Sequence, residues 1–283
     1  MTTTVAAALA AARARGVAPI DAQLLLARAL ATTRTRLIAH DDRSLGPAEA
    51  EQWSASLERR LAGEPLAYLL GEKEFHGLHL EVGADVLVPR PETELVVDWA
   101  AERIPAEALG DSVAAGLPTR IVDLGTGSGA VALALKQLRQ HAEVLGTDVS
   151  AAALAVARRN AARLGLAIEL VESSWWNALG GRRFDLVVSN PPYIAGDDPH
   201  LDALRHEPII ALTPGGDGLG ALRAVVAGAA RHLQPGGWLL LEHGFDQAHA
   251  VRDLLLAAGF GAVETRRDLS GLERATGGRR PSG

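Results

Sequence analysis

The chain has 283 residues, of which 48% are hydrophobic and 22% charged, and its 28 basic and 34 acidic side chains give a formal net charge of −6. This composition suits a folded chain with a sizeable core, excludes a disordered one, and disfavours a sequence-independent grip on nucleic-acid phosphates. Cysteine is absent, which excludes disulfides, zinc ribbons, iron–sulfur clusters and thiol nucleophiles. No apolar stretch reaches the length of about 20 residues that spans a bilayer, so a soluble, cytoplasmic protein is expected.

Residues 1–70 are predicted to be helical throughout, because Ala, Leu, Arg and Gln dominate this segment and favour helices. Pro19 is expected to open one helix. Residues 47–61 are expected to form another, in which Trp53, Leu57 and Leu61 share one face. The segment contains no candidate active-site residue, so we interpret it as a small helical module.

Residues 71–91 are expected to form a hairpin that links two domains. Apolar and polar residues alternate over residues 78–82, which predicts a strand. A turn at residues 83–85 is then expected to lead into a second strand near residues 86–88.

The chain from residue 92 onward is expected to begin with a helix over 92–103 and a surface loop over 105–118, and then to alternate between strands and helices. The expected strands cover residues 120–124, 143–147, 167–171, 184–189, 237–242, 262–267 and 272–276. The expected helices cover residues 128–138, 150–164, 219–233 and 246–258, with Ser150 and Asp246 as caps and residues 277–283 as a loose tail. This alternation predicts an α/β domain with a doubly wound, mainly parallel, seven-stranded sheet.

A glycine-rich turn over residues 125–129 follows the first strand of this domain and opens a helix. Glycines let the backbone approach a ligand, and a helix N-terminus offers free N–H groups, so the turn predicts a nucleotide-type cofactor. The next strand ends at Asp148, where a carboxylate can accept hydrogen bonds from both hydroxyls of a ribose. Together these features favour an adenosine-containing cofactor, and either NAD or S-adenosylmethionine satisfies them.

The buried strand at residues 184–189 leads into Asn190-Pro191-Pro192-Tyr193. The two prolines stiffen this loop, leaving the side-chain oxygen of Asn190 and the carbonyl of Pro191 as acceptors beside the aromatic face of Tyr193. Two acceptors can hold the two hydrogens of an NH₂ group, so that the nitrogen lone pair turns out of conjugation toward an electrophile. The motif therefore predicts a planar, NH₂-bearing substrate and favours S-adenosylmethionine over NAD.

These motifs resemble those of the class I S-adenosylmethionine-dependent methyltransferases that modify amide or exocyclic amino nitrogens. More closely, the chain is similar to the HemK/PrmC family of bacterial release-factor glutamine methyltransferases. Asn-Pro-Pro-Tyr alone is shared with DNA adenine methyltransferases, whereas Arg-Pro-Glu-Thr-Glu at residues 90–94 is more specific to the protein-glutamine group. The resemblance covers nearly the whole chain and is carried by residues 71–75, 88–94, 123–129, 187–194 and 239–244.

The resemblance also implies which residues form the site. The cofactor-binding residues would be Gly125, Thr126, Gly127, Ser128, Gly129, Asp148, Trp175 and Asn190. The catalytic residues would be Asn190, Pro191 and Tyr193, which would bind the substrate together with Pro192. The family usually has an acidic residue just before the adenine-flanking tryptophan, where this chain has Ser174, and Trp176 leaves the choice of tryptophan open by one position.

The activity that the resemblance implies is methyl transfer from S-adenosylmethionine to the side-chain amide nitrogen (N5) of the glutamine in the Gly-Gly-Gln motif of peptide chain release factors. Residues 92–283 would form the methyltransferase domain, and residues 1–70 would recognise the release factor. We expect a monomer with no metal, no membrane and no direct nucleic-acid partner.

Three alternative functions stay open. One is a ribosomal-protein glutamine methyltransferase, which shares the tetrapeptide. Another is an amino-methyltransferase that acts on adenine or cytosine of nucleic acid, which the acidic charge balance disfavours. The third is a non-enzymatic S-adenosylmethionine-binding adaptor, which the intact Asn190 and Tyr193 disfavour.

Overall fold

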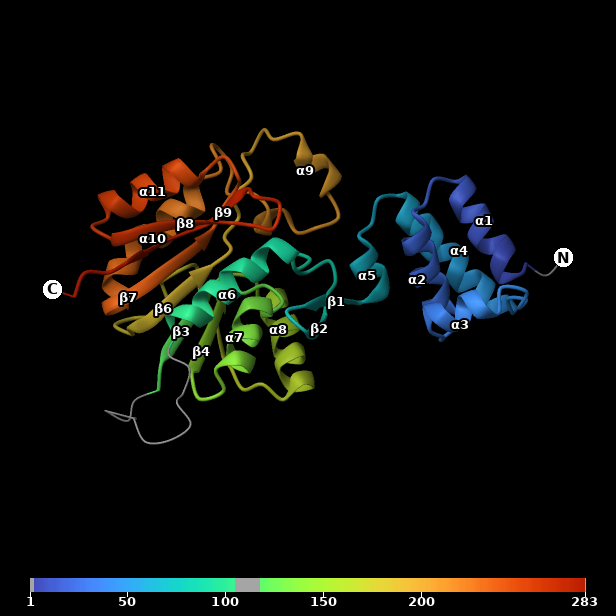
Figure 1. Ribbon diagram of the computed structural model, residues 1–283, viewed down its shortest axis with the longest axis horizontal. Helices are drawn as coiled ribbons and strands as arrows, with labels where there is room; N and C mark the ends of the chain where they lie inside the picture. The colour runs from blue at the N-terminus through green and yellow to red at the C-terminus, as the bar shows by residue number, and fades with distance from the viewer. Residues whose placement is uncertain (1–2, 105–117, 283) are drawn as a thin grey trace. The chain divides into compact units, whose positions relative to one another are not determined.

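The computed structural model describes residues 3–104 and 118–282, which form two compact units, Met1–Lys73 and Glu74–Gly283 (Figure 1). Nearly all of the loop expected at residues 105–118 lies outside the described residues. Each unit has a hydrophobic core of its own. We call them the helical unit and the catalytic unit and describe each by itself.

The helical unit is built from short helices that enclose a small core of leucine, alanine, valine and tryptophan. Its helices are α1 (Val5–Ala14), α2 (Pro19–Ala29), α3 (Arg34–Ala39), α4 (Pro47–Leu61) and α5 (Leu66–Leu70). Pro19 and Pro47 occupy first-turn positions, where a missing N–H costs no hydrogen bond. Trp53 and Leu57 are buried, as the spacing of apolar residues predicts, whereas Leu61, at the end of the helix, is 36% exposed. The expected helical character of residues 1–70 is confirmed.

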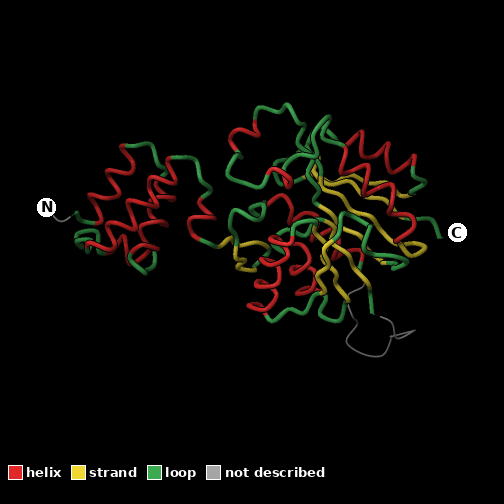
Figure 2. The backbone as a smooth tube through the Cα atoms, turned by 180° about the vertical axis from the view of Figure 1, so that it is seen from behind, coloured by secondary structure: helices red, strands yellow, loops and turns green. Residues whose placement is uncertain are grey.

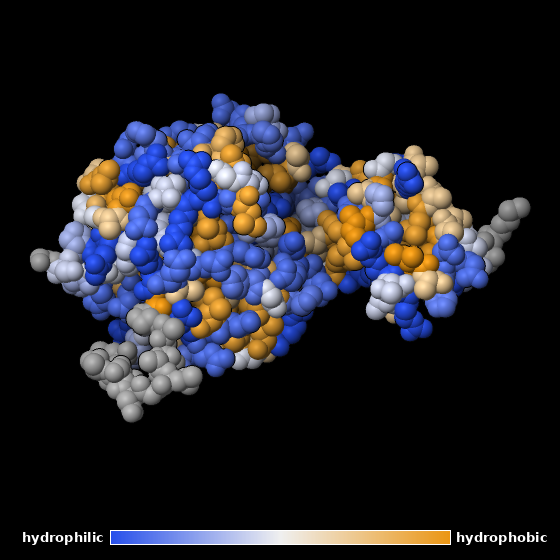
Figure 3. Space-filling model, in the orientation of Figure 1, coloured by the Kyte–Doolittle hydropathy of each residue, from blue (hydrophilic) through white to orange (hydrophobic). Residues whose placement is uncertain are grey.

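The surface of the helical unit mixes apolar and charged residues. On the face shown in Figure 3, hydrophobic and hydrophilic residues are interspersed over this unit. Ile20 and Ile38 are 43% and 51% exposed. Arg15 forms an ion pair with Glu58 across the unit, with a nitrogen–oxygen distance of 2.5 Å. Such a mixed surface offers apolar contacts and charged groups side by side.

A β-hairpin of β1 (Glu72–Phe75) and β2 (Leu78–Glu81) follows. The predicted strand at 78–82 is therefore confirmed, but the second strand expected at 86–88 is wrong. The partner strand instead precedes it, because His76 and Gly77, with φ of 49° and 76°, form a two-residue turn that matches the twist of a hairpin.

The catalytic unit contains a seven-stranded sheet with the order β5-β4-β3-β6-β7-β9-β8. The strands from β5 to β7 pair in parallel, and β9 runs antiparallel to both β7 and β8. This confirms the predicted doubly wound α/β fold. The strands are β3 (Arg120–Leu124), β4 (Glu143–Asp148), β5 (Glu169–Glu172), β6 (Phe184–Ser189), β7 (Leu233–Glu242), β8 (Gly261–Arg267) and β9 (Glu273–Arg279).

Helices cover both faces of this sheet, as Figures 1 and 2 show. One face packs against α6 (Glu94–Arg103), α7 (Ala130–Leu138) and α8 (Ala151–Leu164), and the other against α10 (Gly220–His232) and α11 (Ala248–Ala257). Short helical turns η1 (Pro91–Thr93), α9 (His200–Ala203) and η2 (Ile209–Ala211) lie in the connecting segments. The sheet is thus buried on both faces, which explains the continuous apolar runs of its central strands.

The predicted helix cap is confirmed at α8 and wrong at α11. The Ser150 hydroxyl accepts a hydrogen bond from the Ala153 N–H, 3.1 Å away, and caps α8 as predicted. Asp246 does not cap α11, because the helix begins two residues later and Gln247 is its N-cap residue. The Gln247 side-chain oxygen instead accepts from the N–H of Gly244.

The expected C-terminal tail is wrong for residues 277–279, which complete β9. Gly277 pairs with Leu240 of β7. A Cβ atom at Gly277 would lie only 2.5 Å from a methyl carbon of Leu240 and 2.8 Å from the ring of Trp99. Glycine therefore allows the last strand to lie directly against β7 and Trp99.

The hairpin contributes to the core of the catalytic unit. Phe75, Leu78 and Leu80 are at most 5% exposed and belong to the same apolar cluster as Trp99. A fragment that begins after the hairpin, for example at Val86, would therefore lack part of this core. We place the start of a self-contained catalytic fragment at Gly71.

We predict that Phe75→Ala lowers the free energy of unfolding of the protein by about 3–5 kcal/mol, because it leaves a cavity in this cluster. His79→Ala on the same hairpin, where the side chain is exposed, should change it by less than about 0.5 kcal/mol. Urea denaturation of both variants measures the difference. Equal midpoints for the two variants would contradict the assignment of the hairpin to the core.

Candidate active site

A cavity of about 400 Å³ opens at the carboxyl ends of β3, β4 and β6. The strand order reverses between β3 and β6, and such switch points are where doubly wound sheets bind ligands. Gly125, Asp148 and Asn190, which follow or end these three strands, all line the cavity. The structure thus brings together residues that are separated by up to 65 positions along the chain, as in the hydrogen bond from Ser189 to the Leu124 carbonyl.

The glycine-rich turn forms the floor of this cavity. Gly125, Gly127 and Gly129 have φ of 75°, 55° and 84°, a region where other residues are strained. Gly125 and Gly127 line the cavity. Gly129 is the N-cap residue of α7, and a Cβ there would lie 3.0 Å from the side chain of Leu133, so its role is close packing.

The hydroxyl residues of the turn, Thr126 and Ser128, are buried below the cavity and do not line it. The Thr126 hydroxyl donates to Asp123 over 2.7 Å. Burial raises the pKa of Asp123 to about 7, despite this hydrogen bond. Asp123 therefore anchors the turn from beneath, a role that the sequence motif did not reveal.

Asp148 points into the cavity with both carboxylate oxygens already held. Its Oδ2 accepts from the Gly127 N–H and its Oδ1 from the Ser150 N–H, each over 2.9 Å. Burial raises its pKa above the usual range, and backbone hydrogen bonds from Ser150, Gly127 and Val149 oppose that shift. Each oxygen keeps a further lone pair for a ligand hydroxyl.

The two neighbouring tryptophans have different environments. Trp175 lines the cavity, and its ring lies close to Gly125. Its φ of 51° is unusual for a bulky residue, and the Ser173 hydroxyl donates to its carbonyl over 2.9 Å. Ser174, where the family usually has an acid, also lines the cavity.

Trp176 instead packs into the core. Its ring stacks on His232 at a centroid distance of 4.7 Å, and its indole N–H donates to the Val225 carbonyl. The ring fills the space above Gly228 in α10, where a Cβ would come within 2.1 Å of it. Of these two tryptophans, only Trp175 is therefore placed to contact a ligand in the cavity.

The Asn-Pro-Pro-Tyr segment separates the cavity from a smaller one of about 230 Å³. Asn190 lines both cavities, Pro192 lines the larger, and Tyr193 lines the smaller. Pro191 is buried and its side chain lines neither. The four predicted residues therefore lie at the junction of two spaces, with the Asn190 amide at the meeting point.

Two polar residues below this junction hold the tetrapeptide. The Asn190 side-chain nitrogen donates to the Thr93 hydroxyl over 3.1 Å. The Tyr193 hydroxyl donates to Glu242 over 3.2 Å. Burial and the nearby carboxyl of Glu242 raise the pKa of Tyr193, so its hydroxyl stays protonated.

The residues that form the walls of both cavities were not predicted from the sequence. The larger is also lined by residues 85–87 and by several residues between Pro208 and Pro214. Arg90 lines the smaller one and forms an ion pair with the buried Glu207, which also accepts from the Val88 N–H. Acidic and basic residues 117 positions apart can be paired only once the fold is known.

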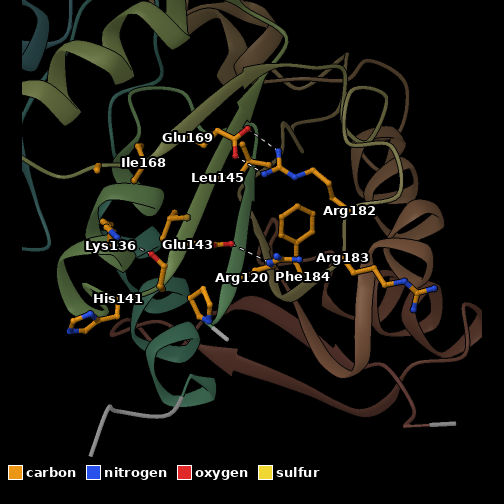
Figure 4. Close-up of a pocket in the computed structure, with 14 residues that line it drawn as sticks. Arg120, Lys136, His141, Glu143, Leu145, Ile168, Glu169, Arg182, Arg183 and Phe184 are labelled. Carbon is orange, nitrogen blue, oxygen red and sulfur yellow. Dashed lines mark hydrogen bonds and ion pairs between the residues drawn. The ribbon is translucent and has the colours of Figure 1, made fainter. Parts of the chain in front are cut away.

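A larger cavity of about 750 Å³ opens at the opposite edge of the sheet, where β3 to β6 begin (Figure 4). Its charged side chains are mostly paired with one another. Arg120 lies 3.1 Å from Glu143, and Arg182 lies 2.5 Å from Glu169. Lys136 donates to two backbone carbonyls. This edge has none of the motifs found at the other. We therefore assign the candidate site to the cavity of about 400 Å³ at the carboxyl ends of β3, β4 and β6.

Within the described parts of the chain, no three histidine or acidic side chains are grouped so that they could hold a metal ion. Within the same residues, no helix is both long and apolar enough to cross a membrane.

Comparison with known proteins agrees with this fold. The family model "Methyltransferase small domain" matches residues 104–269, and the model "PrmC N-terminal domain" matches residues 3–71. Solved structures with similar folds include a methyltransferase from Pyrococcus furiosus (TM-score 0.54, 18% identity, 81% of this chain and 99% of that one). The catalytic domain of human Mettl16 is another (TM-score 0.57, 16% identity, 79% of this chain and 80% of that one).

The fold and the matched domain define the chain as a methyltransferase. Curated relatives named release factor glutamine methyltransferase include those of Burkholderia pseudomallei, 50% identical over 95% of this chain and 94% of the relative, and Xylella fastidiosa Temecula1, 49% identical over 97% and 98%. The Escherichia coli K12 relative is 40% identical over 92% of this chain and 91% of its own length. The chain belongs to the family of release factor glutamine methyltransferases.

We predict that Asp148→Ala weakens binding of S-adenosylmethionine by about 1–3 kcal/mol, because a charged hydrogen-bond acceptor is lost from the cavity. Asp197→Ala, which removes an exposed carboxylate outside the cavity, should leave the affinity unchanged. Titration calorimetry measures both affinities. An unaltered affinity in Asp148→Ala would exclude the predicted role of this carboxylate.

Proposed function

We propose that the protein transfers a methyl group from S-adenosylmethionine to the side-chain amide nitrogen (N5) of the glutamine in the Gly-Gly-Gln motif of peptide chain release factors. The observation that supports this most directly is the position of Asn190, whose side chain borders both cavities. One cavity would hold the methyl donor and the other the acceptor side chain. This function places the enzyme in the cytoplasm, where release factors act.

The cavity of about 400 Å³ at the carboxyl ends of the strands fits the proposed cofactor. Asp148 offers lone pairs on both carboxylate oxygens to the ribose hydroxyls, and Trp175 offers a ring face to the adenine. Gly125 and Gly127 leave room for the methionine part beside the backbone. Bound S-adenosylmethionine supplies an electrophilic methyl group on a positively charged sulfur.

The residues of the chain act on the amide. An amide nitrogen is a poor nucleophile because its lone pair is conjugated with the carbonyl. In the proposed mechanism, the Asn190 Oδ1 and the Pro191 carbonyl accept its two hydrogens and favour the pyramidal nitrogen of the transition state over the planar ground state. Tyr193 packs against the planar group, and the whole arrangement works by positioning.

The relatives distinguish this function from its nearest alternatives. The relatives at 40–50% identity match this chain over more than nine tenths of their own length. They are named release factor glutamine methyltransferases. The helical unit matches the PrmC N-terminal model, so the likeness extends beyond the catalytic domain that many methyltransferases share. Incubation with labelled S-adenosylmethionine and, separately, a release factor, ribosomal proteins and DNA tests the proposal, and label on the release factor is expected.

We predict that Asn190→Ala lowers the turnover number on a release factor by two or more orders of magnitude, because it removes a preorganised acceptor aimed at the reacting group. The affinity for S-adenosylmethionine should change much less. Initial rates of label transfer and calorimetry on the same sample separate the two effects. Near-normal turnover would refute the catalytic role of Asn190.

We also propose that the helical unit recognises the release factor. A single glutamine side chain carries too little surface to identify one protein among many, so recognition must use contacts beyond the pocket. The mixed apolar and charged surface of the helical unit suits such contacts.

A fragment of residues 71–283, which keeps the hairpin, should therefore bind S-adenosylmethionine like the full chain but methylate an intact release factor at least tenfold more slowly. A short peptide that contains Gly-Gly-Gln serves as the control substrate, because it carries little surface beyond the reacting side chain. The fragment and the full chain should modify this peptide at similar rates. Full activity of the fragment on the intact factor would contradict the proposal.

A further inference from the structure

Gln247, the residue before α11, contacts the tetrapeptide but has no role in the mechanism described so far. Its side-chain nitrogen, Nε2, donates to the Tyr193 carbonyl over 2.9 Å. Its side-chain oxygen, Oε1, accepts from the Gly244 N–H, also over 2.9 Å. Gln247 lies 54 positions beyond Tyr193, so nothing in the tetrapeptide motif indicates this contact. One side-chain amide therefore bridges the end of the tetrapeptide and the turn that follows β7.

The two partners of Gln247 determine which way round its amide lies. A backbone carbonyl can only accept a hydrogen bond, and a backbone N–H can only donate one. The NH₂ end must therefore face Tyr193, and the oxygen must face Gly244. Turning the amide over would place two acceptors together at one end and two donors at the other, so both hydrogen bonds would be lost.

The turn that holds the oxygen of Gln247 is itself held by buried side chains. Burial lowers the pKa of His243, so its ring is neutral. The His243 Nδ1 lies 2.8 Å from the Gly244 carbonyl, which can only accept, so the ring hydrogen is on Nδ1. The other ring nitrogen, Nε2, then accepts from the Thr276 hydroxyl over 2.7 Å. His243 and Thr276 are both fully buried, and Gly244 is therefore a fixed point from which Gln247 reaches Tyr193.

Gly218 leaves the room in which this contact forms. The residue is buried and has φ of 75°. A Cβ atom there would lie 2.4 Å from the Tyr193 carbonyl oxygen and 3.0 Å from the Gln247 Nε2. A side chain at this position would displace one of the two partners, so the hydrogen bond requires glycine at residue 218.

The tetrapeptide depends on such contacts because much of its backbone cannot donate. Pro191 and Pro192 have no N–H, so the backbone cannot be held by a donor at either position. In the proposed mechanism, the Pro191 carbonyl is kept for the substrate amide. A hydrogen bond to the Tyr193 carbonyl holds the end of the segment without using either proposed acceptor.

We propose that Gln247 is a positioning residue, which holds the Tyr193 carbonyl in the space that Gly218 leaves and so keeps the acceptors of Asn190 and Pro191 aimed at the reacting nitrogen. The inference rests on the proposed function of the tetrapeptide. Gln247 lines neither cavity, so it acts through Tyr193 and not by contact with a ligand. Because the Tyr193 hydroxyl donates to Glu242, the main chain and the side chain of Tyr193 are both held by the segment that ends β7 and begins α11.

The first test separates the two hydrogen bonds of Gln247. Gln247→Glu keeps an oxygen for the Gly244 N–H but places a second acceptor against the Tyr193 carbonyl. Turnover on a release factor should fall at least tenfold, because a small displacement of the aligned groups is costly. The KM for the factor and the Kd for S-adenosylmethionine should stay within twofold. Gln137→Glu, the same change at an exposed position of α7, should leave all three unaltered.

A purely structural role for Gln247 predicts a different pattern. The retained oxygen would then suffice, so Gln247→Glu would be nearly as active as the wild-type protein, whereas Gln247→Met, which lacks both hydrogen-bonding groups, would lose turnover. That pattern would overturn the proposal. A large loss of affinity for S-adenosylmethionine in Gln247→Glu would also overturn it, because the effect would then extend beyond the tetrapeptide.

The second test uses two glycines with nearly the same backbone conformation. Gly218 and Gly215 have φ of 75° and 76°, so alanine is similarly strained at both. A Cβ atom at Gly215 would meet nothing within 4 Å, unlike one at Gly218. Turnover should therefore be at least tenfold lower in Gly218→Ala than in Gly215→Ala. Equal turnover in the two variants would show that the close approach to the Tyr193 carbonyl does not matter and would contradict the proposal.

A third measurement needs no substrate. The ¹³C signal of the Tyr193 carbonyl, detected through the N–H of Ile194, reports whether the carbonyl oxygen accepts a hydrogen bond. It should move upfield in Gln247→Met and stay unchanged in Gln137→Met. This shift would support the positioning role even if no release factor were methylated, in which case only the proposed function would fail. An unchanged signal in Gln247→Met would overturn the inference whatever the substrate.

Discussion

The parallel pairing of β3 with both β4 and β6 is the constraint on which the site depends. Leu124 lies opposite Thr147 on one side and Ser189 on the other. The next residues along these strands are Gly125, Asp148 and Asn190, so the three segments leave the sheet in step at one edge. A shift of one residue in either pairing would turn a site residue to the other face of the sheet. The apolar strands that fix this register are therefore as necessary to the site as the residues that line it.

Much of this arrangement was predictable, because strand ends and the turns that follow them are local signals. The glycines at 125–129, the carboxylate at 148 and the tetrapeptide at 190–193 each mark the end of a strand, and parallel strands place such ends at one edge. The hairpin turn was not predicted because one of its two residues with positive φ is His76. Such turns usually carry glycine, asparagine or aspartate at both positions, and here only Gly77 fits that pattern. Trp175 and Trp176 were indistinguishable in the sequence, since only Gly228 on a distant helix makes space for the second ring.

The residues that the sequence did not reveal are mostly buried and polar. Asp123 and Glu242 are both carboxylates in the interior, each with a pKa raised to about 7 by burial. Burying such groups costs folding free energy. Each nevertheless supports a segment that borders the site, Asp123 through Thr126 and Glu242 through Tyr193. Patterns of apolar residues predict a core, and they give no sign of a polar group that is buried to orient another.

The packing of Trp176 couples the site to a helix on one face of the sheet. The ring occupies the space above Gly228 of α10 and is held by its stack on His232 and its hydrogen bond to Val225. Trp175, the next residue, therefore takes its position in the cavity wall from contacts that its neighbour makes on the far side of the backbone. A substitution on this helix can thus alter the Trp175 side of the cavity without touching a lining residue. A single added methyl group at Gly228 would suffice, which makes this helix a hidden determinant of the shape of the cavity wall.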